Sequence, residues 1–158
     1  MNVLGLGRVK VGLRPLLSVA CFAAVFCGVS WGSLGSSVAS VSTDQARMKG
    51  SIRISQAAGY SVHEIQSPTG TSVREFVSPD GKVFGVAWNG PAHPDLQQLL
   101  GPYFNTYVQA AKKRTAHGAR RIQVPGLVVE LSGHQRAFLG RAYVPEMVPA
   151  NVGTESIK

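Results

Sequence analysis

The sequence predicts an α+β fold: an antiparallel sheet of about five or six strands, ordered as a meander, a helix and further strands, with one main helix packed on one face. Three observations predict it. From Gly59 to Trp88, polar and apolar side chains alternate with a period of two. From Asp95 to about Thr115, apolar side chains recur every three or four residues, as on one face of a helix. After Arg120 the alternation typical of strands returns.

The expected strands are short and separated by tight turns. Ser-Pro-Thr-Gly at 67–70 and Ser-Pro-Asp-Gly at 78–81 each combine a proline, which presets φ, with a glycine, which accepts a positive φ. Consecutive strands joined by such turns form an antiparallel meander. The ranges expected for strands are 60–65, 71–77, 82–88, 121–124, 127–132 and 135–144, with a brief further strand around Ile52 and Ile54.

The main helix is expected to be interrupted. Pro102 lacks the backbone N–H that a helix interior needs, but it suits the first turn of a new helix. We therefore expect a short helix over 95–100 that abuts a longer one from 102 to about 115. Three basic residues at the end of the longer helix complement the helix dipole.

The first 40 residues have the composition of a secretory signal. Three basic residues precede an uncharged apolar run from Leu16 to about Trp31, after which small residues follow. A membrane-spanning helix needs about 20 apolar residues, more than this run contains, and this favours a cleaved signal. The alternative is that the segment is retained as an N-terminal membrane anchor. We expect residues 1–32 to be a signal peptide that is cleaved near Gly32, or alternatively after Ala39, and the protein to be periplasmic or secreted.

Removal of this segment divides the chain into three expected parts. Residues 33–58 form an N-terminal extension with a short helix, which Ser42 and Gln45 begin as a capping box. Residues 59–150 form a single α+β domain, and residues 151–158 form a C-terminal tail. Both cysteines lie in the apolar run of the signal, so the mature chain has no disulfide. It keeps all 8 acidic residues and most of the 16 basic ones, and we expect no transmembrane helix in it.

The segment Val73–Trp88, with the sequence VREFVSPDGKVFGVAW, resembles the central signature of an uncharacterised family of secreted bacterial proteins, domain of unknown function twenty-eight forty-four. The similarity continues at Gly90-Pro91, at 127–130 and at 136–145, and it covers essentially the whole mature chain. In this family a Leu-Gly pair lies just after the cut, which favours cleavage near Gly32. The resemblance implies an exported protein and carries no known catalytic residue, substrate or cofactor.

No catalytic or cofactor motif stands out in the sequence. After the expected signal peptide the chain contains no Gly-x-Ser-x-Gly, and it contains no glycine-rich phosphate loop followed by the required pattern. The histidines never occur as His-x-His or His-x-x-His. We therefore expect no metal, no cofactor and no enzymatic activity. The alternative is a hydrolase whose unrecognised site includes Glu130 and His134. Glu64, Glu75 and Glu130 lie in the middle of strands, where we expect them to form cross-strand charge pairs on the solvated face.

Two groups of residues are candidate contact sites. The first is a basic cluster that could contact anionic surfaces: Lys112, Lys113, Arg114, Arg120 and Arg121. The second is a candidate groove between the sheet and the start of the helix, with Trp88, His134 and Arg136. We expect a non-enzymatic accessory or binding module of the cell envelope. The alternative is a peripheral envelope protein whose basic loop binds anionic lipid, lipopolysaccharide or polysaccharide. Nucleic acid is not an expected partner of an exported protein.

Overall fold

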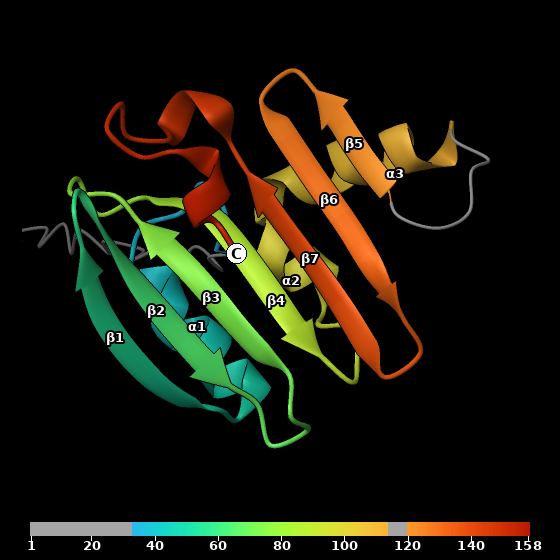
Figure 1. The fold of residues 1–158 in the computed structure, drawn as a ribbon, viewed down its shortest axis with the longest axis horizontal. Helices are drawn as coiled ribbons and strands as arrows, with labels where there is room; N and C mark the ends of the chain where they lie inside the picture. Colours follow the sequence, from blue (N-terminus) through green and yellow to red (C-terminus); the bar gives the residue numbers. More distant parts are fainter. Residues whose placement is uncertain (1–32, 114–119) are drawn as a thin grey trace, which may run out of the picture.

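The strands form one antiparallel sheet in the order β1-β2-β3-β4-β7-β6-β5 (Figure 1). The structure is a computed structural model that describes residues 33–113 and 120–158. Within these residues the seven strands are β1 (Ser51–Ala57), β2 (Tyr60–Gln66), β3 (Ser72–Val77), β4 (Val83–Gly90), β5 (Arg120–Val124), β6 (Leu127–His134) and β7 (Ala137–Tyr143). The predicted α+β fold is confirmed. The strand number is seven instead of five or six, because the brief strand expected around Ile52 and Ile54 is a full strand that pairs with β2 over its whole length.

Two meanders make up this sheet. Strands β1 to β4 follow one another in sequence and in space, and strands β5 to β7 do the same. The pairing of β4 with β7, from Gly85 opposite Tyr143 to Gly90 opposite Phe138, joins them into one surface. The division expected at residue 58/59 therefore falls inside the sheet, because β1 belongs to it.

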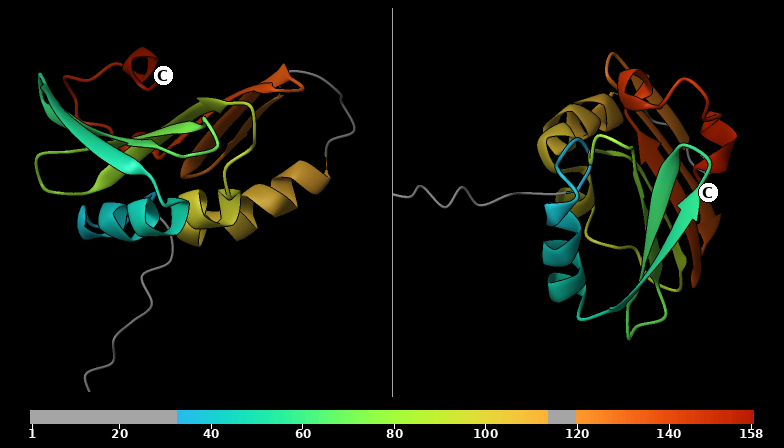
Figure 2. Two further views of the ribbon diagram at one scale, coloured as in Figure 1. Left: turned by 90° about the horizontal axis from the view of Figure 1, so that it is seen from below. Right: turned by 90° about the vertical axis from the view of Figure 1, so that its left-hand side faces the viewer.

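The helices cover one face of the sheet, which we call the helix side (Figure 2). They are α1 (Ala39–Met48), α2 (Leu96–Leu100), the 3-10 turn η1 (Gly101–Tyr103) and α3 (Phe104–Lys112). The expected interruption is confirmed: Gly101 adopts a positive φ of 49°, and Pro102 lies at the start of the turn. Asp95 caps α2, because its Oδ1 accepts hydrogen bonds from the backbone N–H groups of Gln97 and Gln98 at 2.9 and 3.2 Å.

Helix α1 begins earlier than the capping box predicted. Its N-cap is Val38, which makes no side-chain cap hydrogen bond, and Ser42 lies inside the helix. The reason is that the preceding residues are held by the core. Leu34 is fully buried, and its backbone N–H donates to the carbonyl of Leu99 at 3.1 Å. The N–H of Gly35 donates to the carbonyl of Val83 at 2.8 Å, so the chain enters α1 from a fixed position.

The C-terminal residues lie across the opposite face of the sheet, which we call the outer face (Figure 2). This segment contains the 3-10 turns η2 (Pro145–Met147) and η3 (Thr154–Ser156). Ile157 is fully buried, and a Cβ on Gly85 of β4 would stand 3.1 Å from its Cδ1. Residues 151–158, expected as a tail, are therefore part of the packed structure. This segment covers only part of the outer face, and charged side chains of the strands lie on the rest of it.

Candidate functional site

A row of charged side chains crosses the outer face of the sheet. Antiparallel pairing places one residue of each strand on this row, and the alternation of side chains puts all of them on the outer face. We call it the charged row: Arg53, Glu64, Arg74, Ala87, Arg141, Glu130 and Arg121, from β1 across to β5. Basic and acidic residues alternate along it on both sides of Ala87, as expected of cross-strand charge pairs.

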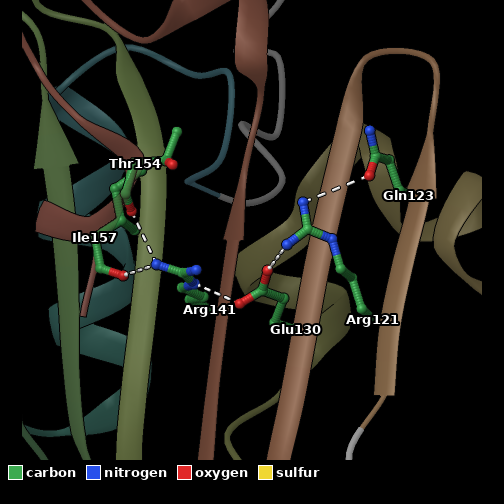
Figure 3. A network of polar contacts seen from close by, with 6 residues as sticks. All are labelled: Arg121, Gln123, Glu130, Arg141, Thr154 and Ile157. Atoms are coloured by element: carbon green, nitrogen blue, oxygen red, sulfur yellow. Dashed lines mark hydrogen bonds and ion pairs between the residues drawn. The ribbon is translucent and has the colours of Figure 1, made fainter.

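The half of the charged row next to β5 is internally paired (Figure 3). Glu130 Oε1 lies 2.6 Å from Arg121 Nη1, and Glu130 Oε2 lies 2.7 Å from Arg141 Nε. Arg141 Nη1 also donates to the backbone carbonyls of Thr154 and Ile157, at 2.8 and 3.2 Å. The cross-strand pairing predicted for Glu130 is confirmed. Arg141 therefore ties the C-terminal segment to the sheet.

The other half of the charged row keeps its cations unpaired. Glu64 Oε1 accepts a hydrogen bond from Ser72 Oγ at 2.9 Å. Arg53 and Arg74 form no ion pair with any residue in the described part of the chain, and neither does Lys158, which lies above them. The Nε of Arg74 is buried and lacks a hydrogen-bond partner among these residues. This half therefore offers positive charge to a ligand.

Two hollows flank Lys158 on the outer face. One, of about 360 Å³, is lined by the three unpaired cations, by Glu64 and by the rings of Tyr60 and Phe76, and we call it the outer-face hollow. The second has about 420 Å³ and is lined in part by Trp88 and Arg141. Arg74 and Lys158 line both hollows, so the two are neighbours on one surface. A larger hollow of about 700 Å³ lies between α3 and β5, and among its described lining residues Lys113 is the one that carries a charge.

The residues of the predicted basic cluster do not share one surface. Lys112 and Lys113 are exposed at the end of α3, and Arg114 lies outside the described residues. Arg120 pairs with Leu131, whose side chain packs into the helix-side core, whereas Arg121 pairs with Glu130 on the outer face. Adjacent strand residues point to opposite faces, which separates these two arginines.

The residues of the predicted groove are also separated. Trp88 is 1% exposed, and a Cβ on Gly140 would stand 2.2 Å from its Cζ2, so the indole lies directly against the β7 backbone. His134 and Arg136 are exposed at the turn between β6 and β7, where Arg136 adopts a φ of 65°. His134 pairs with Ala137, three residues along β7 from the partner of Trp88. Of the three residues, Trp88 alone lines a hollow of the outer face in the described structure.

The residues of the alternative hydrolase site are likewise apart. Glu130 and His134 lie four residues apart on β6, which corresponds to about 13 Å along a strand. Both oxygens of Glu130 are occupied by arginines, and the Nδ1 of His134 lies 3.1 Å from the carbonyl of Gln135. Within the residues that the structure describes, no three His, Cys, Asp or Glu side chains gather as metal ligands would.

A buried pair of carboxyl groups, Asp44 and Glu75, lies between the sheet and the helices. The prediction that Glu75 lies on the solvated face is wrong: Glu75 is fully buried, and Asp44 of α1 is 1% exposed. Gln98 of α2 donates from Nε2 to Asp44 Oδ1 at 2.6 Å. The alternation along β3 carries the signal that was missed, because Glu75 has the same parity as the buried Val73 and Val77.

The environment of the two carboxyl groups favours their protonated forms. Burial, and then the neighbouring charge of Asp44, raise the pKa of Glu75 to about 9. Burial also raises the pKa of Asp44, an effect that the hydrogen bond from Gln98 opposes. Both oxygens of Glu75 and the Oδ2 of Asp44 have no hydrogen-bond partner among the described residues. A protonated Glu75 that donates to Asp44 satisfies this arrangement. Gln98 lines the adjacent hollow, but neither carboxyl group does. Through Asp44 and its bond to Gln98, the pair joins α1 and α2 to the sheet.

No helix in the described part of the chain is both long and apolar enough to cross a membrane. In comparisons with known proteins, no curated protein and no solved structure matches this chain. A family model does match, over residues 30–157, which include all of the strands and helices described above. The chain therefore belongs to the family described as "Protein of unknown function (DUF2844)".

Proposed function

We propose that this protein is an exported, non-enzymatic binding module of the cell envelope that presents the outer face of its sheet to an envelope component. The unpaired half of the charged row supports this proposal most strongly. Arg53, Arg74 and Lys158 stand around one hollow on the face that the helices do not cover, with one carboxylate beside them. A surface with such an excess of positive charge attracts anionic partners, and it does so more strongly at low ionic strength.

Two observations support export. The N-terminal residues have the order of a secretory signal, and the family model matches from residue 30, close to the expected cut. The burial of Leu34 favours the cut near Gly32, because a cut after Ala39 would remove this core residue.

The full chain, expressed in a bacterial host, is expected to be recovered outside the cytoplasm with its N-terminus near Ser33. N-terminal sequencing of the purified protein, together with cell fractionation, measures this. A cytoplasmic product that still begins with Met1 would contradict export.

Removing two unpaired cations of the outer face should release the protein from the envelope. We expect the exported wild-type protein to sediment with washed envelopes at about 50 mM salt and to be released by about 300 mM, as screening weakens the attraction. The variant Arg53→Gln/Arg74→Gln should already be soluble at the lower salt concentration. The measurement is the sedimented fraction at each salt concentration.

The matched control is Lys112→Gln/Lys113→Gln, which removes the same charge from the exposed end of α3. It should sediment as the wild type does. If the control is released and the outer-face variant is not, the contact surface is the basic cluster at α3, and the proposed face is wrong.

A further inference from the structure

We propose that the outer-face hollow binds the carboxylate-bearing sugars of an acidic polysaccharide. This inference rests on the proposed function, which makes the outer face the contact surface, and it names the class of ligand. The argument uses the charges of the hollow, its aromatic and hydroxyl groups, and its continuity with the second hollow.

The charges of the hollow fit an oxyanion. Arg53, Arg74 and Lys158 line it without ion pairs among the described residues, whereas its carboxylate, Glu64, is held by Ser72. An arginine binds a carboxylate through two parallel N–H groups. Arg74 is half-buried in the wall of the hollow, so part of its guanidinium group remains open to a ligand.

The other lining groups fit a sugar ring better than a bare anion. Tyr60 and Phe76 line the hollow with their ring centroids 6.0 Å apart. Phe76 is buried, and the half-buried ring of Tyr60 offers the surface on which an apolar face of a sugar can pack. The hydroxyls of Ser55 and Ser156 line the same hollow and can exchange hydrogen bonds with sugar hydroxyls. Binding sites for small organic groups combine apolar surface with a few placed polar groups in this way.

The shape favours a polymer. Arg74 and Lys158 line both the outer-face hollow and the second hollow, which the ion pair of Arg141 and Glu130 also lines. A chain of acidic sugars that fills the first hollow can therefore continue past Lys158 into the second. Arg74 and Lys158, which lie between the two hollows, would then stay in contact with the polymer.

A lipid surface fits the same face less well. A protein that binds in a membrane interface buries apolar side chains beside its basic ones. In the described residues the exposed large apolar side chains are Val38, just before α1, Ile54 on β1 and Leu139 on β7. The hollow is recessed between the sheet and the C-terminal segment, so a flat bilayer would not reach its floor.

Binding of the purified protein to polygalacturonate at about 50 mM salt tests the proposal. We expect binding by the wild type, no binding to neutral dextran, and about tenfold weaker binding for Arg74→Gln, the loss of one charge-assisted contact. Arg120→Gln removes an exposed arginine at the start of β5 and should bind as the wild type does. Arg74→Lys keeps the charge and loses the planar guanidinium group. Its affinity for polygalacturonate should lie between those of the wild type and Arg74→Gln.

Several outcomes would overturn the proposal. Equal or tighter binding to polyphosphate would make phosphate the ligand group, and binding to anionic phosphatidylglycerol vesicles alone would make the partner a membrane. Absence of polygalacturonate binding would exclude this class of polysaccharide. If Arg53→Gln/Arg74→Gln still releases the protein from envelopes in that case, the contact face stands and the ligand class is wrong; if it does not, both proposals are wrong. Thermal unfolding of each variant checks that the fold is intact.

Discussion

Replacing Glu75 with Gln is expected to leave the protein folded and to make its stability far less dependent on pH than that of the wild type. Glu75 has an ordinary pKa of 4.5 in the unfolded chain and about 9 in the folded protein. Between these values the folded protein keeps a proton that the unfolded chain releases. The contribution of Glu75 to stability is therefore fully present below about 4.5 and is lost as the pH rises through about 9.

The size of this effect follows from the linkage of protons to folding. Over the pH range between the two pKa values, the free energy of unfolding falls by up to about 1.4 kcal/mol for each pH unit. The amide of Glu75→Gln cannot ionise, but it can still donate a hydrogen bond to Asp44. Urea denaturation of both proteins at about pH 5, 7 and 8.5 measures this effect. The free energy of unfolding of the variant should rise relative to that of the wild type as the pH rises.

The matched control is Glu64→Gln on the neighbouring strand β2. Glu64 lies on the outer face, away from the buried pair, so its replacement removes one acid without altering the surroundings of Glu75 and Asp44. Parallel profiles for wild type and Glu75→Gln would mean that Glu75 does not hold a proton in the folded protein.

Truncation of Trp88 should destabilise the protein by about 3–5 kcal/mol, because its buried indole fills the space above Gly140. Gly140→Ala should cost about 1–3 kcal/mol or more, because the new Cβ would overlap the indole. The double variant should lose less than the sum of the two losses, since the smaller side chain at 88 leaves room for the new methyl group.

Urea denaturation of the four proteins gives this coupling. Leu139→Ala serves as the control, because Leu139 lies next to Gly140 but is 50% exposed, and its replacement should cost well under about 2 kcal/mol. Strictly additive losses for Trp88 and Gly140 would contradict the packing described here.

Local chemistry accounts for the features that could be predicted from the sequence. The turn at 78–81 and the helix interruption at Pro102 depend on residues adjacent in the chain, and both occur as predicted. The alternation that marks β2 to β4 and β6 to β7 depends only on a period of two. These signals were sufficient for the α+β class and for most element boundaries.

Contacts between distant segments account for the features that could not be predicted. Glu75 is buried beside Asp44 of α1, which in turn accepts a hydrogen bond from Gln98 of α2. The local sequence of either helix does not indicate this arrangement. The charged row depends on the pairing of β4 with β7, two strands that are not consecutive. The local sequence pattern does not reveal this pairing, so it assigns Arg74 and Arg141 to separate meanders. The surface that joins the two hollows could therefore not be predicted.

Nuclear magnetic resonance of the arginine side chains tests the central claim, that the outer face is the contact surface, most directly. In a titration of the ¹⁵N-labelled protein with polygalacturonate, the Nε–H signals of Arg53 and Arg74 are expected to shift first and furthest. The signals of Arg47 on α1 and Arg120 should stay in place, because both lie away from the outer-face hollow. Shifts confined to Arg120 and the end of α3, with Arg53 and Arg74 unchanged, would contradict the account.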